Sequence, residues 1–287
     1  MNKKLIILAL ALFIIGCTTT TQQQCPKINC PVVKCPDVPI VDSKALVFVY
    51  FIDVGQGDAI LIKSGETEML IDCGKNSAGP IVTDFLKQKQ VGDLEYLLIT
   101  DTDSTNLGGC IDVLNKFNVH TIITNGEESD TISYKEVMDK IDTEQNIIAD
   151  IGQKWNIGPA EIRIIQPSNG LSDSNENSIV SKFSYGTTDM LFTGNCKNLC
   201  EDLLLNKDIQ SEILKVAYHG SKYASEVDFL EKVMPQIAII TIGENNYGHP
   251  APETIDRLTQ QGVSIYRTDI DGDITFRINP NSYEIIK

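Results

Sequence analysis

Short apolar runs alternate with amphipathic stretches along most of the chain, starting at residue 45. The apolar runs predict strands at residues 46–53, 59–63, 68–72, 96–100, 121–124, 162–166, 178–183, 190–193, 213–217, 237–242, 263–267 and 274–278. The amphipathic stretches predict helices at residues 81–88, 111–117, 134–141, 197–205, 227–233 and 252–260. Strands at hairpin spacing open each half before helices appear, which favours one α/β domain with a two-layered sheet. The Asp-Gly pair at residues 271 and 272 predicts a hairpin turn.

The N-terminal residues do not follow this alternation. Lys3 and Lys4 precede an apolar run at residues 5–15, which is too short to span a hydrocarbon layer of ~30 Å but suits a secretion signal. The run ends in Gly16-Cys17 and resembles a bacterial lipoprotein signal. We therefore expect residues 1–16 to be a signal peptide and Cys17 to be lipidated, which would export the protein and anchor it to the cell membrane with its domain outside the cytoplasm. A plain cleaved signal or an uncleaved anchor is the alternative.

Residues 17–44 have the composition of a tether between this anchor and the domain at residues 45–287. Cys25, Cys30 and Cys35 are each followed by proline, which predicts an extended segment. This spacing lacks the close cysteine pairs of zinc sites, so disulfides are favoured over a metal clip in an exported protein. Seven cysteines remain if Cys17 is lipidated, out of eight in the chain. An odd number predicts a free thiol or an intermolecular bridge.

The chain has a formal net charge of −15, and no run of basic residues follows the signal. Binding to nucleic acid depends on Lys and Arg neutralising phosphates. The average charge therefore argues against a DNA-binding surface, although a local basic patch could exist within an acidic whole.

Polar residues follow several of the predicted strands directly. Residues 101–106 follow one strand, and Asn195, His219 and His249 follow three others. Side chains at the carboxyl ends of strands converge on one rim of an α/β sheet, so this arrangement predicts a cleft. The alternative is that polar loops follow strands in every α/β protein.

The residues of these loops and strands resemble a known family, the metallo-β-lactamase-fold domain of ComEC-type competence proteins, which drive DNA uptake, and its free-standing relatives. The similarity runs in family order from about residue 46 to residue 278. The matching segments are residues 51–60 (FIDVGQGDAI), 70–74 (LIDCG), 98–100 (LIT), 107–109 (LGG), 177–178 (NS), 192–194 (FTG), 214–216 (LKV), 219–221 (HGS) and 247–250 (YGHP). The resemblance implies an αββα sandwich, with two β-sheets flanked by helices.

The chain departs from the family at its metal ligands. The family's main metal loop, His-x-Asp-x-Asp-His, falls on Asp101, Asp103, Thr105 and Asn106, where only Asp103 keeps its residue type. The acidic ligand of the family's Thr-Gly-Asp is Asn195 here. The family's His-His-Gly-Ser becomes Tyr218-His219-Gly220-Ser221.

These substitutions change the metal that the site could hold. The chain has three histidines, and one of them, His120, lies far from the loops and is expected to be a structural or surface residue. A histidine-rich dinuclear zinc site therefore cannot be assembled. The oxygen-rich residues that remain would suit Mg²⁺, Mn²⁺ or Ca²⁺ if the cleft binds a metal.

The resemblance assigns roles to individual residues and leaves three hypotheses of function open. The first is a metal-dependent phosphodiesterase or nuclease with an eroded site, and the second is a non-catalytic, surface-tethered module that binds a ligand or partner. A third hypothesis is that the cleft holds a DNA strand without cutting it. The sequence identifies no protein partner.

A disulfide between Cys73 and Cys110, next to two site loops, is compatible with the sequence, and for Cys196 and Cys200 pairing and burial both stay open. The assigned metal ligands are Asp101, Asp103, Asn106, Asn195 and His219, with Asp103 and His219 as the catalytic pair, and the supporting residues are Asp53, Asp58, Asp72, Asn177 and His249.

Overall fold

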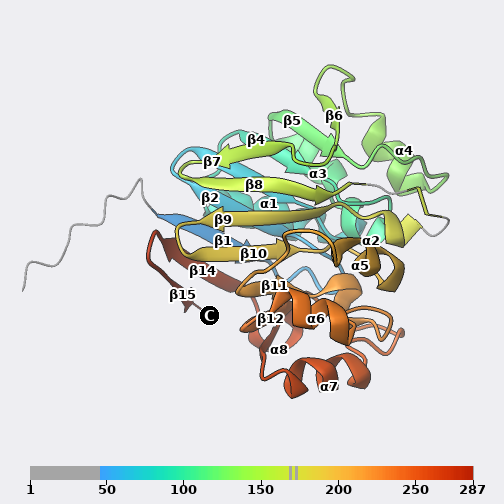
Figure 1. Ribbon diagram of the computed structural model, residues 1–287. Coiled ribbons are helices and arrows are strands. Elements are labelled where there is room, and N and C mark those ends of the chain that lie inside the picture. Colours follow the sequence, from blue (N-terminus) through green and yellow to red (C-terminus); the bar gives the residue numbers. More distant parts are fainter. Residues whose placement is uncertain (1–45, 168–169, 172–173, 287) are drawn as a thin grey trace, which may run out of the picture. The chain divides into compact units, whose positions relative to one another are not determined.

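The computed structural model describes residues 46–286, except 168–169 and 172–173 (Figure 1). The predicted signal peptide, the tether and Cys17 lie outside the described residues. All described residues lie in one compact unit. In this part of the chain, no helix has both the length and the apolar character needed to cross a membrane.

Two sheets form the centre of the domain (Figure 1). The first has eight strands in the order β15-β14-β1-β2-β3-β4-β5-β6. Its strands are β1 (Val47–Phe51), β2 (Ile60–Ser64), β3 (Thr67–Ile71), β4 (Leu94–Leu98), β5 (Val119–Thr124), β6 (Asn146–Ile148), β14 (Ile274–Asn279) and β15 (Ser282–Ile286).

The second sheet has seven strands in the order β13-β12-β11-β10-β9-β8-β7. Its strands are β7 (Lys154–Ile157), β8 (Ala160–Gln166), β9 (Val180–Tyr185), β10 (Thr188–Phe192), β11 (Ile213–Lys215), β12 (Ile237–Ile240) and β13 (Ser264–Arg267).

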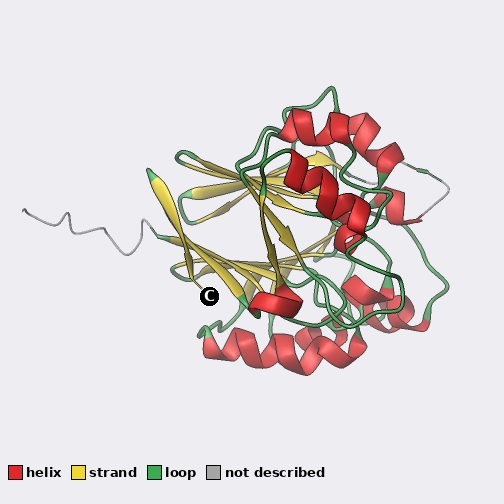
Figure 2. Ribbon diagram, turned by 90° about the horizontal axis from the view of Figure 1, so that it is seen from below, coloured by secondary structure: helices red, strands yellow, loops and turns green. Residues whose placement is uncertain are grey.

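Helices lie on the outer sides of the two sheets (Figure 2). One outer layer packs the apolar side chains of α1 and α3 against the first sheet, and the other packs α5, α6 and α7 against the second. The layer order is therefore helix, sheet, sheet, helix, and the predicted αββα sandwich is confirmed. The helices are α1 (Gly79–Gln88), α2 (Ser104–Leu107), α3 (Cys110–Lys116), α4 (Ile132–Met138), α5 (Asn198–Leu204), α6 (Val227–Val233), α7 (Pro252–Gln260) and α8 (Thr268–Asp271), with 3₁₀ segments at Asn76–Ala78, Ser174–Asn177 and Ala217–Gly220.

The main core fills the space between the two sheets. Phe51 of β1 is fully buried there, and its ring lies 6.1 Å from that of Phe192 in β10 and 5.9 Å from that of Phe276 in β14. Successive side chains of a strand point to opposite faces of its sheet, so a strand supplies residues both to this core and to an outer layer. This explains why the strand pattern could be recognised in the sequence.

Parallel pairing brings several strand ends to one edge of each sheet. In the first sheet Ile71, Leu98 and Ile123 of β3, β4 and β5 are in register. In the second sheet the same holds for Phe192 and Lys215 of β10 and β11, and Lys215 is in turn in register with Ile239 of β12. The loops that follow these residues therefore start side by side, as the sequence predicted.

Three strands and one connection differ from the sequence predictions. Strands β6, β7 and β15 were not predicted, because each has many half-exposed or exposed side chains and lies at the edge of a sheet. The predicted hairpin turn at Asp271 and Gly272 is wrong. These residues end α8, a one-turn helix that connects β13 of the second sheet to β14 of the first.

Two disulfides fasten the loops near this edge. One joins Cys73, which follows β3, to Cys110 at the start of α3, and the other joins Cys196 to Cys200 in α5. The Cys73–Cys110 bridge agrees with the sequence analysis, whereas the sequence had left the partners of Cys196 and Cys200 open.

Glu201 of α5 ties this helix to α6. Its buried carboxylate accepts the backbone N–H of Ser225 at 2.6 Å and that of Glu226 at 3.0 Å, just before α6 begins. Burial opposes the charged form and raises the pKa of Glu201 to about 8.

We predict that Phe51→Ala destabilises the domain by about 3–5 kcal/mol, because it leaves a cavity between the sheets. Chemical denaturation of the full-length chain measures this change in the free energy of unfolding. The matched control is Ile270→Ala, since Ile270 is 69% exposed, and its effect should stay within about 0.5 kcal/mol. Equal effects of the two substitutions would contradict this description of the core.

We also predict that the free energy of unfolding falls as the pH rises from about 4.5 to about 8, partly because of Glu201. In this window the folded chain retains a proton on Glu201 that the unfolded chain has released, so a rising pH favours unfolding. Glu201→Gln cannot ionise and should give a shallower pH dependence in denaturation curves. Glu231→Gln, an exposed position on α6, serves as the control and should keep the wild-type slope.

Candidate functional site

A buried ion pair joins the two sheets at the edge where the strand ends meet. Asp58 follows the turn after β1, and Lys215 is the last residue of β11; each is 1% exposed, and the Lys215 ammonium donates to the Asp58 carboxylate. The same ammonium donates to the carbonyl of Gly194 at 3.0 Å. The Asp58 carboxylate also accepts the hydroxyl of Thr241. Each charge therefore has partners, as burial of an ion pair requires.

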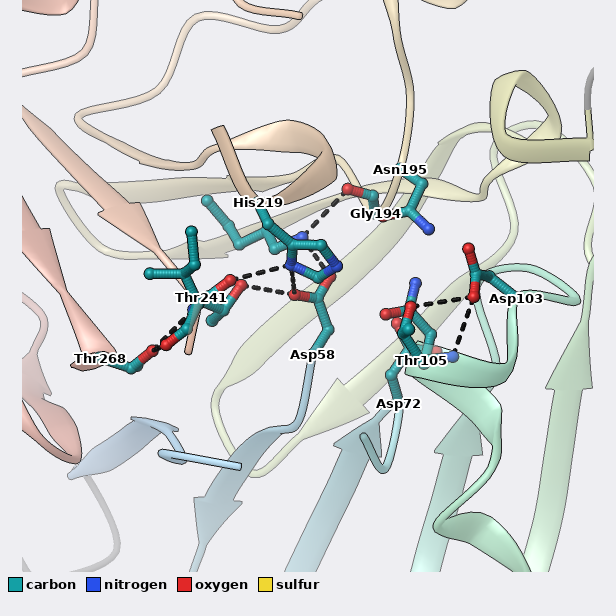
Figure 3. Close-up of polar contacts among 12 residues, drawn as sticks. Asp58, Asp72, Asp103, Thr105, Gly194, Asn195, His219, Thr241 and Thr268 are labelled. Atoms are coloured by element: carbon teal, nitrogen blue, oxygen red, sulfur yellow. Dashed lines mark hydrogen bonds and ion pairs between the residues drawn. The ribbon is translucent and has the colours of Figure 1, made fainter. Parts of the chain in front are cut away.

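His219 lies beside this pair, and its tautomer follows from its contacts. Its Nδ1 lies 2.8 Å from the carbonyl oxygen of Thr241, which can only accept, so Nδ1 carries the proton. Burial lowers the pKa of His219, although the nearby Asp58 opposes this shift. The ring is therefore neutral, and its Nε2 is an acceptor that has no hydrogen-bond partner among the described residues. Figure 3 shows this side of the ring turned toward Asp103 and Thr105.

Backbone conformation brings the loops of the site close together. A Cβ atom on Gly57 would lie 2.3 Å from the carbonyl oxygen of Thr105, so only glycine permits this approach. The backbone is in the left-handed region, which residues other than glycine rarely adopt, at Asp72 (φ 56°), Tyr218 (φ 46°) and His219 (φ 53°). Such strain costs of order 1–3 kcal/mol per residue and is concentrated at functional sites.

Hydrogen bonds connect the positions at which this chain departs from the family's metal ligands. The Asp101 carboxylate accepts the Asp103 N–H at 2.9 Å, the Asn106 side-chain amide at 3.0 Å and the Ser178 hydroxyl at 2.6 Å. Ser178 Oγ in turn accepts the N–H of Asn195 at 2.8 Å. Positions 101, 106 and 195 thus belong to one buried network, which we call the Asp101 network.

Two buried carboxylates of this region, those of Asp72 and Asp101, have raised pKa values. Asp72 is fully buried and accepts the backbone N–H and the hydroxyl of Thr100. Burial, together with the charges of Asp101 and Asp58, raises the pKa of Asp72 well above its usual value. Burial also raises the pKa of Asp101 to about 6, although its hydrogen-bond donors oppose the shift.

An open cavity of about 110 Å³ lies between the loops that follow β1, β4, β11 and β12. It brings together Asp103 and His219, which the sequence analysis assigned as the catalytic pair, and also His249. Its lining residues are Gln56, Asp103, Ser104, Thr105, Tyr218, His219, Tyr247 and His249. A second cavity of about 180 Å³, which includes Asp101, Thr102, Asn125 and Tyr134 in its lining, lies at the end of β5 beside α4.

The remaining predicted site residues do not line the smaller cavity. Asn106 and Asn195 are buried in the Asp101 network. Asn177 binds the backbone of Leu171 through its side-chain amide. Asp53 accepts the N–H of Gly55, and its own N–H donates to Asp273, so it shapes the turn after β1. His120 is exposed and lies 3.5 Å from Asp93, a surface position as expected.

Sequence reasoning did not single out several residues of the site. Lys215 and Ser178 were noted only as parts of matching motifs and of predicted strands. Their roles depend on contacts with residues more than 70 positions away, which spacing does not reveal. Gln56 and Tyr247 also lay within matching motifs, and their position in those motifs was the one signal that could have identified them.

The metal centre that the fold family implies can be tested against these residues. In residues 46–286, outside the two gaps, no group of three or more His, Cys, Asp or Glu side chains is arranged to hold a metal ion. The oxygens of Asp101 already accept donors of the chain, and an ammonium is bound at Asp58. The residues present therefore do not fit a dinuclear centre.

Comparisons with known proteins agree with the motifs. No protein-family model matches the chain. The chain is 26% identical over 254 residues to ComE operon protein 3 of Bacillus subtilis, covering 80% of this chain and 33% of that protein. It is also 26% identical over 243 residues to competence protein ComA of Neisseria gonorrhoeae, covering 83% and 33%. The chain thus spans about a third of the length of these curated relatives.

Solved structures show the same fold at low sequence identity. The metallo-beta-lactamase fold protein YhfI from Bacillus subtilis superposes with a TM-score of 0.58 at 10% identity, covering 82% of this chain and all of YhfI. CmlA, a diiron beta-hydroxylase from Streptomyces venezuelae, gives a TM-score of 0.55 at 9% identity and covers 81% of this chain and 54% of CmlA. The chain therefore has the metallo-β-lactamase fold and is similar in sequence to part of the ComEC-type competence proteins.

Proposed function

We propose that this domain is a non-catalytic relative of the ComEC-type domain, in which the cleft binds a ligand without the metal chemistry of its fold. The Asp101 network is the observation that carries this proposal. A carboxylate has about four lone-pair sites, and three of those of Asp101 serve the N–H of Asp103, the amide of Asn106 and the hydroxyl of Ser178. A cation at this position would have to displace donors that the chain itself supplies.

The open cavity supports binding as the function that remains. It is lined by strained backbone at Tyr218 and His219 and contains polar groups from the loops that follow four strands. His219 Nε2 is one of them, since it is buried without a hydrogen-bond partner among the described residues. An unpaired buried acceptor is costly, which favours a ligand that donates to it.

The proposal places the domain outside the cytoplasm, held at the cell membrane by a lipid on Cys17. Disulfides persist in oxidising compartments and are rare in the cytosol. The Cys73–Cys110 and Cys196–Cys200 bridges are therefore in keeping with export.

Hydrolysis of a phosphodiester such as DNA, assisted by a Mn²⁺, Mg²⁺ or Ca²⁺ ion, is the competing function. The observation in its favour is that Asp103 and His219 both line the cavity. Against it stands the charge of the cavity: its lining includes one carboxylate and neither Lys nor Arg. Phosphate groups are bound mainly by such basic residues. The same argument opposes a cleft that holds DNA without cutting it.

We predict that the full-length chain retains no stoichiometric Mn²⁺, Mg²⁺, Ca²⁺ or Zn²⁺ after separate exchange against each metal and removal of free ions. Elemental analysis measures the metal content. A chromogenic phosphodiester and single-stranded DNA, incubated with each metal, should be hydrolysed no faster by the wild type than by the Asp103→Ala, His219→Ala double variant.

Near-stoichiometric Mn²⁺ that is lost in Asp103→Ala, together with hydrolysis that is lost in the double variant, would overturn the proposal in favour of the hydrolase. An exposed-site variant, Asp228→Ala on α6, is the control, since it removes a carboxylate outside the cavity.

A further inference from the structure

We infer that the small cavity beside His219 binds a guanidinium group, as found at the end of an arginine side chain. This inference rests on the proposed function and names the chemical class of its ligand. It follows from three features of the cavity: its unpaired acceptors, its aromatic wall and its charge.

The acceptors come from residues that are almost completely buried. His219 is 2% exposed and Gln56 is 6% exposed, both line the cavity, and His219 Nε2 and Gln56 Oε1 have no hydrogen-bond partner among the described residues. The Asp103 carboxylate lines the same space and accepts from Thr105 through Oδ1. A ligand that satisfies these groups has to carry several N–H donors. Guanidinium has five, in a planar arrangement.

Three aromatic rings form one wall of the cavity. The His249 ring lies 5.6 Å from that of Tyr218 and 5.9 Å from that of Tyr247, and all three residues line the space. Tyr247 is 70% exposed, so the wall extends outward as a rim. Aromatic faces attract organic cations, and guanidinium also stacks on them. The chain already uses one of these rings in this way, since Lys197 Nζ lies 5.3 Å from the centre of the Tyr218 ring.

The charge of the cavity lining favours a cation over an anion. Asp103 is the one charged side chain in its lining. Burial lowers the pKa values of His219 and His249, which disfavours a positive charge on either ring. A metal ion is disfavoured because no group of three or more His, Cys, Asp or Glu side chains among the described residues is arranged to hold one. An organic cation matches the negative charge of Asp103 and needs no metal ligands.

The size of the cavity limits the ligand to a head group. At about 110 Å³, it is well below the lower limit of roughly 300 Å³ for pockets that enclose a drug-sized molecule. A nucleoside would not fit inside, whereas the end of an extended side chain would. The open side then lets the rest of the ligand pass over Tyr247.

The test is titration of the full-length chain with butylguanidinium, butylammonium and the uncharged isostere butylurea, followed by calorimetry. We expect butylguanidinium to bind with one-to-one stoichiometry and butylammonium to bind more weakly, because it offers fewer donors in a different geometry. Butylurea should not bind, since it lacks the charge that Asp103 attracts. No binding of butylguanidinium, or equal binding of all three probes, would overturn the inference.

Two substitutions locate the binding in this cavity. Asp103→Asn should weaken butylguanidinium binding about tenfold, the effect of losing one charge-assisted hydrogen bond. Tyr247→Ala should weaken it about two- to fivefold, the size of a cation–π contact at an exposed site. Tyr223→Ala is the matched control, because Tyr223 is 56% exposed and lies outside the cavity. Equal losses in Tyr247→Ala and Tyr223→Ala would contradict the assigned position.

A parallel titration with Mn²⁺ separates this inference from the proposed function. If Mn²⁺ binds stoichiometrically and Asp103→Asn abolishes that binding, both fail. If neither Mn²⁺ nor butylguanidinium binds, the guanidinium assignment fails while the proposal of a cleft without metal chemistry stands.

Discussion

The carboxylate of Asp101 is the group on which the arrangement of the cleft depends. It accepts an N–H, an amide and a hydroxyl from three different residues, and through Ser178 it reaches the backbone of Asn195 in the loop that follows β10 of the second sheet. The loops after β4 and β10 are thereby joined across the two sheets. In the family that the motifs resemble, metal ligands occupy these positions. Here the connection consists of hydrogen bonds, and this is why the scaffold can be retained while the ligand set is lost.

A second cross-connection orients the side chain that faces the cavity. The Lys215 ammonium neutralises Asp58, and Asp58 holds Thr241, whose carbonyl fixes the His219 ring in one tautomer. Because the ring is buried and neutral, its Nε2 is left as an acceptor. Strained backbone at Tyr218 and His219 thus places a hydrogen-bond acceptor in the wall of the cavity, which is also lined by the Asp103 carboxylate and by aromatic rings. These are properties of a binding site for a donor-rich cation.

The sequence predicted the fold well because the buried strands have continuous or alternating apolar patterns. It also placed Asp103, His219 and His249 at one rim, since each follows a strand whose end lies at the same edge. It did not predict the roles of Lys215 and Ser178, whose partners are 157 and 77 residues away. Asp101 and Asn106 were assigned to a metal because they stand at ligand positions of the family's metal loop. Their mutual hydrogen bond depends on the backbone path of the loop, which the motif does not specify.

The most direct test of this account is the free energy of unfolding of the full-length chain, measured in a chelator and in excess Mn²⁺, for the wild type and for Asp101→Asn. If the Asp101 carboxylate serves the chain's own donors, Mn²⁺ should leave the stability of both proteins unchanged. A carboxylate kept for a cation would bind Mn²⁺ in the folded state, and this binding would stabilise the wild type but not Asp101→Asn. In that case the account would be wrong.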